Sequence, residues 1–342
     1  MERNKIKLVT RKENSYQILM AVFDNEVNAQ RPCPISGSHK ALVVCERDRH
    51  KKPLRNVINM ESGLIYVDPV PFKNTEEFYK NEYRKSYKGV HEPKPKHIYR
   101  AGKNAIERLD KIKHILHPSS KILDAGSSSG EFVYLAKRQG HRAFGLEANI
   151  PYAEFSRKSL KIEVTNAAFS QYKGGNDFDC ITLFHVLEHL EYPLRDLTHL
   201  SQCLKPGGFI VIEVPNISYH NMTLSHKWHP GHLYSYTNDT LVALLETMGF
   251  TSVECTEVDK GANVFGIFEK TDNEIFTKII AKNSASSILA NLLKANRAYY
   301  WNLFNYLKPL SKLLKNIKEM HASSGKSPKM ILDRLLDNFE SL

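Results

Sequence analysis

The chain has 342 residues, of which 42% are hydrophobic and 25% charged, an ordinary composition for a globular protein with room for more than one domain. It contains no run of about 18 apolar residues and no signal-peptide pattern, so we expect neither a membrane-spanning helix nor a secreted protein. Five cysteines without a Cys-x-x-Cys pair indicate reduced thiols in a cytoplasmic protein.

Residues 1–90 are expected to form a small N-terminal region, in which two segments resemble a zinc ribbon that has lost most of its ligands. The segments are Cys33-Pro-Ile-Ser-Gly37 and Asn59-Met-Glu-Ser-Gly63, and the four ligand positions fall on Cys33, Ser36, Asn59 and Ser62. A structural zinc site needs about four Cys or His ligands, and one cysteine remains. The sequence predicts a metal-free relic held by packing alone, with an ordinary loop cysteine as the alternative.

Residues 91–270 are predicted to form an α/β domain with a Rossmann-like, seven-stranded sheet. A tyrosine-rich stretch, residues 76–87, precedes it and is expected to cover the sheet edge or the mouth of a ligand site. Apolar residues at helical spacing predict a helix over 98–116. Strands centred near residues 122, 144, 163, 181 and 211 alternate with helices, which is typical of a parallel sheet covered on both faces. A helix over 240–248 and two strands near 253 and 266 complete this domain.

The turn after the first of these strands is the most informative segment. The strand ends in Asp124, glycines follow at Gly126 and Gly130, and the second strand ends in Glu147. An acid at that place can accept both hydroxyls of a ribose. The glycine spacing differs from the dinucleotide pattern Gly-x-Gly-x-x-Gly, and Gly130 is followed by Glu131, which repels phosphate, instead of the lysine of a P-loop. The loop therefore predicts a nucleoside ligand without phosphates.

Four segments in order resemble the motifs of class I S-adenosylmethionine-dependent methyltransferases. They are Leu123–Gly130, Gly145–Asn149, Phe178–Leu190 and Leu204–Asn216. The family loop usually reads Gly-x-Gly, and Ser128 replaces its second glycine. The resemblance implies S-adenosylmethionine as cofactor and a binding site formed by Asp124, Gly126, Ser128, Gly130, Glu147, Ala148, Asn166, Ala167, Phe184 and His185.

Catalytic groups are expected beyond the fourth and fifth strands, in two histidine-rich segments, residues 184–189 and 226–234. An imidazole is a suitable general base because its pKa lies near neutrality. His229 is the first candidate, His232 the second, and His189 a third whose alternative role is structural. His226, His229 and His232 are interrupted by Pro230-Gly231 and match no compact metal motif, so no metal is expected.

The resemblance implies methyl transfer to a small-molecule or glycan acceptor, with a hydroxyl as the expected target. Sugar-modifying methyltransferases often begin with a zinc ribbon, and similar enzymes carry a His-x-x-His-Leu-aromatic stretch. Quinone or lipid O-methyltransferases, which share the His-Val-Leu-Glu-His-Leu stretch, remain an alternative, as does a binding module without activity. A nucleic-acid acceptor is suggested by the basic C-terminal segment, but the core contains no Asn-Pro-Pro-Tyr-like motif.

Residues 271–342 are predicted to form a basic helical extension. Between residues 275 and 330, ten Lys and Arg stand against one acid, Glu319, which accounts for most of the net charge of +11. An apolar stripe is predicted along one helix, made of Leu310, Leu313, Leu314, Ile317 and Met320, with lysines beside it. This helix is expected either to cap the core or a homodimer interface, or to lie on an anionic membrane surface.

Overall fold

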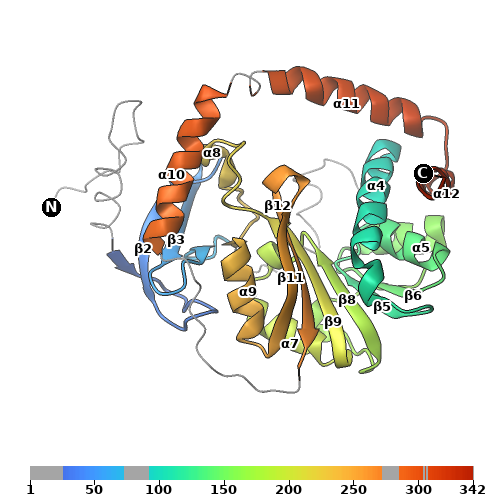
Figure 1. Cartoon of the computed structure of the whole chain (residues 1–342), viewed down its shortest axis with the longest axis horizontal. Helices are drawn as coiled ribbons and strands as arrows, with labels where there is room; N and C mark the ends of the chain where they lie inside the picture. The colour runs from blue at the N-terminus through green and yellow to red at the C-terminus, as the bar shows by residue number, and fades with distance from the viewer. Residues whose placement is uncertain (1–25, 73–91, 272–284, 303–304, 306, 342) are drawn as a thin grey trace.

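The structure, a computed structural model, describes residues 26–72, 92–271, 285–302, 305 and 307–341 (Figure 1). The tyrosine-rich stretch at 76–87 lies outside the described residues. The central element is a seven-stranded sheet with the order β11-β12-β9-β8-β5-β6-β7. This arrangement confirms the predicted α/β, Rossmann-like fold with additional N- and C-terminal regions.

Five strands of this sheet are parallel. They are β5 (Lys121–Ala125), β6 (Arg142–Leu146), β7 (Val164–Thr165), β8 (Phe178–Phe184) and β9 (Leu204–Pro215). Two antiparallel strands, β12 (Asn263–Lys270) and β11 (Phe250–Val258), extend the sheet beyond β9. The central strands are rich in apolar residues, as expected for strands buried on both faces. All the carboxyl ends of the parallel strands therefore meet at one edge.

Helices cover both faces of the sheet, and alternate strand residues enter two different cores. Ile122, Cys180 and Val211 pack with helices α4 (Pro95–Ile112), α5 (Glu131–Arg138), α6 (Ile150–Phe155) and α12 (Pro328–Glu340). Leu123, Ile181 and Ile212 face α7 (Pro193–Ser201) and α9 (Asn238–Glu246). Helix α4 begins with Pro95 in its first turn, where a missing N–H is tolerated, and it continues as a short 3-10 turn, Lys113–Ile115.

The N-terminal region forms an antiparallel sheet whose strands are β1 (Glu26–Asn28), β2 (Lys40–Arg47), β3 (Pro53–Asn59), β4 (Ile65–Val67) and β10 (Tyr234–Ser235). Strand β10 lies in the long connection after β9 and pairs with β4, so that Tyr234 lies opposite Tyr66. One face of this sheet joins the core that contains α7 and α9. The N-terminal region is thereby fixed to the segment that carries the predicted catalytic histidines.

The described C-terminal residues are largely helical, and they contact the N-terminal sheet and the helices on one face of the seven-stranded sheet. Helix α10 (Ala285–Trp301) packs on the N-terminal sheet through Ile288, Leu289 and Leu292. Helix α11 (Lys308–Ser323) crosses from α10 toward α4, and α12 packs on α4 and α5 (Figure 1). A methyl group on Gly102 of α4 would approach Leu332 of α12 within 2.5 Å. Among the helices that the structure describes, none combines the length and apolar character needed to cross a membrane.

Candidate functional site

The turn between β5 and α5 follows a tight path at the carboxyl edge of the sheet. Gly126 and Gly130 both have φ of 84°, and a Cβ at either position would lie within 2.5 Å of Val186 or Ile162. Ser128 adopts φ of 51°, the left-handed conformation that a glycine accepts readily. The serine that replaces the usual glycine therefore follows the same kind of path.

Glu147, at the end of β6, is held by this loop. Its Oε2 accepts the backbone N–H of Ser128 at 2.7 Å and its Oε1 accepts the N–H of Asn149 at 2.8 Å. Each carboxylate oxygen can accept a further hydrogen bond, so the group fits a ribose diol. Asn166 fixes the adjoining backbone by donating to the carbonyl oxygens of Glu147 and Ala148 at 2.8 and 3.0 Å.

The start of α5 does not suit a phosphate. Glu131 is buried in the first turn of this helix and accepts a hydrogen bond from Ser129 Oγ at 2.6 Å. Its negative charge occupies the helix end where an anion would otherwise be stabilised. In the same loop, Ser127 Oγ is buried and has no hydrogen-bond partner in the described part of the chain. This loop fits an adenosyl ligand that carries polar groups and no phosphate.

Asp124, which precedes the loop, is buried beneath it. Its Oδ1 accepts a hydrogen bond from Thr182 Oγ1 at 2.8 Å. Burial raises the pKa of Asp124 to about 7, against the lowering effects of Thr182 and Arg108. The carboxyl group is therefore partly protonated near neutrality, and its direct contact with the ligand stays a prediction.

A charged network lies at the ends of β8 and β9. Arg108 of α4 donates two hydrogen bonds of 2.8 Å to Glu213 of β9, and its guanidinium lies 4.3 Å from the ring centroid of Phe184. His185 Nε2 lies 3.0 Å from Glu213 Oε1. Burial alone raises the pKa of Glu213, but hydrogen bonds from Arg108 and His185 outweigh it and hold this pKa well below its ordinary value.

His185 links this network to Glu188. Its Nδ1 lies 3.5 Å from Glu188 Oε1. Burial lowers the pKa of His185, but the contacts with Glu188 and Glu213 outweigh burial and raise the pKa to about 9. At neutral pH His185 is an imidazolium between two carboxylates. It adopts φ of 57°, an uncommon conformation for a residue with a side chain.

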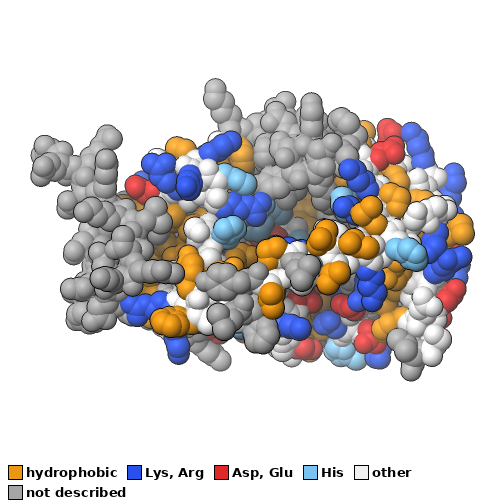
Figure 2. Space-filling model, turned by 90° about the horizontal axis from the view of Figure 1, so that it is seen from above, with side chains coloured by type: hydrophobic (Ala, Val, Ile, Leu, Met, Phe, Trp, Pro, Cys, Tyr) orange, Lys and Arg blue, Asp and Glu red, His pale blue; other side chains and the backbone are white. Residues whose placement is uncertain are grey.

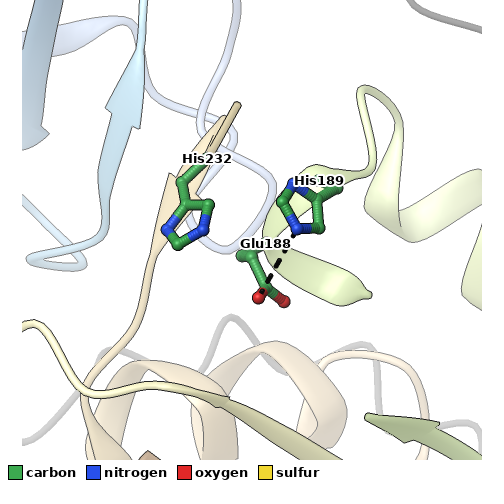
Figure 3. A group of neighbouring side chains, drawn as sticks. All are labelled: Glu188, His189 and His232. Carbon is green, nitrogen blue, oxygen red and sulfur yellow. Dashed lines mark ion pairs between the residues drawn. The ribbon is translucent and has the colours of Figure 1, made fainter. Parts of the chain in front are cut away.

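The predicted catalytic histidines come together at this end of the sheet. The ring centroids of His189 and His232 lie 5.0 Å apart, and those of His229 and His232 lie 4.2 Å apart in a stacked arrangement. Glu188 points toward His189, with its Oε1 3.7 Å from Nε2 (Figure 3). His226 interacts instead with Thr223 Oγ1 at 2.8 Å.

His229 and His232 are poor proton acceptors. Burial, with smaller effects from Arg49 and His189, lowers the pKa of His229 to about 3. Burial and the neighbouring His189 also place the pKa of His232 well below its ordinary value. Both rings are neutral near pH 7, but a base with so low a pKa removes a proton inefficiently. The choice of His229 as the first candidate for the general base stays a prediction.

Arg108 and Glu213 were not predicted from the sequence. Glu213 left a signal, because it is a charged residue inside the apolar run Phe209–Val214, where an unpaired charge would be costly. No sequence pattern pointed to Arg108, since a basic residue on an amphipathic helix usually faces solvent. Its role depends on a contact 105 residues away in sequence.

The central part of the chain is similar to known methyltransferases. A model described as a methyltransferase domain matches residues 97–255, just under half of the chain. The ubiquinone biosynthesis O-methyltransferase of Dinoroseobacter shibae is 27% identical over 151 residues, and the alignment covers 39% of this chain and 61% of that protein. The corresponding protein of a Ruegeria species has the same identity and coverage. The chain thus spans about three-fifths of the length of these relatives.

Solved structures of methyltransferases resemble about half of the chain. An S-adenosylmethionine-dependent methyltransferase of Archaeoglobus fulgidus is 20% identical, with a TM-score of 0.43, and the match covers 55% of this chain and 98% of that one. The magnesium protoporphyrin IX methyltransferase of Synechocystis PCC 6803, solved with bound SAH, is 11% identical with a TM-score of 0.45, and the match covers 57% and 98%.

Proposed function

We propose that residues 97–255, which match a model described as a methyltransferase domain, form a class I S-adenosylmethionine-dependent methyltransferase domain, and that the protein methylates a hydroxyl group of a small-molecule or glycan acceptor. The observation that supports cofactor binding most directly is Glu147. The backbone N–H groups of Ser128 and Asn149 orient its carboxylate at the end of β6. The cofactor supplies an activated methyl group when bound, so the protein has to align the acceptor and deal with its proton.

The cofactor is proposed to lie along the carboxyl edge of the sheet, as the sequence predicts. The loop from Gly126 to Gly130 and Asp124 would hold its amino-acid end, and Glu147 would accept the ribose hydroxyls. Ala148, Asn166 and Ala167 would border the adenine. Phe184 ends β8 and His185 follows it at the same edge, where they would meet the ligand beside the loop.

Acceptor activation is assigned to the cluster of Glu188, His189, His229 and His232. Val186, two residues before Glu188, packs against Gly126 of the cofactor loop, so the cluster adjoins the proposed cofactor site. His189 Nδ1 lies 2.7 Å from the Gly231 carbonyl oxygen. A carbonyl oxygen only accepts, so Nδ1 carries the hydrogen and Nε2 is the atom turned toward Glu188.

Two acceptor classes agree with different observations. A glycan is favoured by the arrangement of the N-terminal region and by His229-Pro-Gly-His232-Leu-Tyr234, as the sequence resemblance implies. A quinone or lipid acceptor is favoured by the names of the curated relatives, which are ubiquinone biosynthesis O-methyltransferases. Both acceptors would be methylated on oxygen, so hydroxyl methylation is the part of the proposal that they share.

Two further aspects concern location and partners. We propose a cytoplasmic location, supported by five cysteines that form no disulfide in the described residues. We also propose that α11 makes peripheral contact with an anionic membrane surface, which would suit an acceptor carried on a lipid.

Calorimetry with S-adenosylhomocysteine tests the cofactor site through Glu147→Gln. A hydrogen bond to a charged group contributes about 1.5–3 kcal/mol, so the variant is expected to bind at least about tenfold more weakly. Glu154→Gln is the matched control, because Glu154 is an acid on α6 paired with Lys158 at the surface. Equal affinity of Glu147→Gln and the unmodified protein would contradict the proposed site.

A further inference from the structure

Glu188, His189 and His232 bring three metal-ligand groups to one place. One atom from each side chain, a carboxylate oxygen or an imidazole nitrogen, lies within 4.8 Å of the other two. Glu188 and His189 belong to the short turn after β8, and His232 comes from the connection after β9 (Figure 3). We propose that these three side chains bind a divalent transition-metal ion.

The buried carboxylate is the first argument. Glu188 is 1% exposed, and its Oε2 has no hydrogen-bond partner within the described ranges of the chain. A buried carboxylate oxygen without a partner is energetically costly. A cation beside the two imidazoles that contacts both oxygens of Glu188 would satisfy it.

The orientation of His189 is the second argument. The hydrogen bond between its Nδ1 and the Gly231 carbonyl directs Nε2 toward Glu188, 3.7 Å from Oε1. Histidines that bind metals usually donate their other ring N–H to a carbonyl or carboxylate in this way. Two ligand atoms at about 2.1 Å from one ion lie no more than about 4.2 Å apart, so this pair already has a suitable separation and His232 needs a small movement.

The groups around the cluster both support the carboxylate and oppose a cation. His185 Nδ1 lies 3.5 Å from Glu188 Oε1, and outer partners of this kind commonly orient a ligating carboxylate. The ring of His229 stacks on that of His232, with the centroids 4.2 Å apart. Arg49 and His185 bring positive charge near His232 and oppose the binding of a cation.

The ligand set indicates both the kind of ion and its use. Two imidazoles and one carboxylate suit Zn²⁺, Co²⁺ or Mn²⁺ better than Mg²⁺, and three protein ligands leave a position open. Resting on the proposed function, we assign this position to the acceptor oxygen. The hydroxyl would lose its proton to solvent, an O–C bond would form, and the C–S bond of the cofactor would break with its electron pair on sulfur. This site differs from the interrupted triplet 226/229/232 and departs from the sequence-based expectation of no metal.

Titration of the untagged, chelator-treated full chain with Co²⁺ tests the site. We expect one Co²⁺ per chain and visible absorption bands. The variants His232→Gln and Glu188→Gln should bind Co²⁺ at least about tenfold more weakly. Loss of an outer partner of a metal ligand already lowers metal affinity by about tenfold or more, and loss of the ligand itself should cost no less. His114→Gln, a change at an exposed histidine beyond α4, should bind as the unmodified chain does. No Co²⁺ binding, or equal affinity in all four proteins, overturns the proposal.

Two measurements make the outcome independent of variant folding and of the proposed function. X-ray absorption of the Co²⁺-loaded unmodified protein should report two imidazole ligands, and a shell of oxygen atoms alone would overturn the site. S-adenosylhomocysteine binding is measured on the same samples. Its failure would count against the proposed methyl transfer and leave the metal result readable, whereas intact binding with no Co²⁺ site would overturn the metal site alone.

Discussion

At the scale of single residues, the cofactor edge of the sheet combines buried charges with unusual backbone. Ser128 and His185 both adopt positive φ, a conformation that costs a residue with a side chain about 1–2 kcal/mol. The two lie in the turns after β5 and β8, next to the atoms proposed to contact the cofactor. Such strain persists where the surrounding structure holds it, which is common at functional sites.

Burial of Asp124 makes the free energy of unfolding depend on pH. Its pKa of about 7 in the folded protein exceeds the ordinary value near 4, so the folded state holds the proton more tightly. The stability from this group is present below about pH 4 and is lost as pH rises through about 7. We expect Asp124→Asn to be more stable than the unmodified protein at pH 8, by on the order of 1–4 kcal/mol, and the difference to shrink toward pH 4.

Urea unfolding at pH 4, 6 and 8 checks this prediction. His185, with a folded pKa of about 9, also contributes stability that is present below about pH 6.5 and is lost as pH rises through 9, but it does so in both proteins and cancels in the difference. Asp110→Asn, a change at a surface acid paired with Lys113, is the control. If the difference between Asp124→Asn and the unmodified protein stayed constant from pH 4 to 8, the burial argument would be wrong.

At the scale of elements, the N-terminal sheet is tied together by the four residues aligned with ribbon ligands. Ser36 Oγ and Ser62 Oγ donate to Asn59 Oδ1 at 2.9 and 3.1 Å, and Cys33 Sγ lies 3.1 Å from Ser62 Oγ. All four side chains are buried. The expectation that packing alone holds this region is wrong, because hydrogen bonds join all four positions. Its descent from a zinc ribbon stays a proposal.

This geometry predicts that a metal site can be restored. The triple variant S36C/N59C/S62C would place four thiols together, and Zn²⁺ should then raise its stability by roughly 3 kcal/mol at a hundredfold excess over Kd. Thermal unfolding with and without Zn²⁺ measures the effect. The same triple change combined with Cys33→Ser, which leaves three thiols, is the control. A four-cysteine protein indifferent to Zn²⁺ would show that the four positions do not converge as ligands.

The sequence predicted those features of the fold and site that depend on local pattern. The helix expected over 98–116 is α4 followed by its 3-10 turn, and Glu147 ends its strand as expected because a β-turn-α unit fixes both. Strand β10 was missed, since Tyr234 and Ser235 show no alternating pattern and form a strand only by pairing with β4. The meeting of His189 with His232, and of Arg108 with Glu213, likewise depends on packing between segments distant in sequence.

At the scale of the whole molecule, α11 presents an unusual outer face. Its one acid, Glu319, is buried and accepts a hydrogen bond from Arg100 Nε of α4 at 3.0 Å. Most of its exposed side chains are apolar or basic. Leu313, Leu314, Ile317 and Met320 are each more than half exposed, whereas the side chain of Leu310 lies outside the described residues. The view onto this side of the molecule shows hydrophobic side chains among Lys and Arg (Figure 2).

An anionic lipid surface is the partner proposed for this face. Lys312 and Lys318 are exposed beside the apolar residues, and Trp301 at the end of α10 is 87% exposed. A basic helix with an apolar side lies in the headgroup region of a bilayer, and each lysine near an anionic surface contributes about 1 kcal/mol. The opposite side of α11 contacts α4, and that side could cap the core. A capping role therefore does not account for the exposed apolar and basic face.

Vesicle flotation with the full chain tests this proposal. We expect co-flotation with vesicles containing phosphatidylglycerol, weaker at high salt because the attraction is screened, and none with phosphatidylcholine alone. The double change L313E/I317E should reduce the floated fraction at least about tenfold, because membrane binding would then place two negative charges, in place of two apolar side chains, in the bilayer interface. Val253→Glu, at an exposed apolar residue of β11, should float normally. Equal flotation of L313E/I317E and the unmodified chain would show that the membrane contact, if any, is made elsewhere.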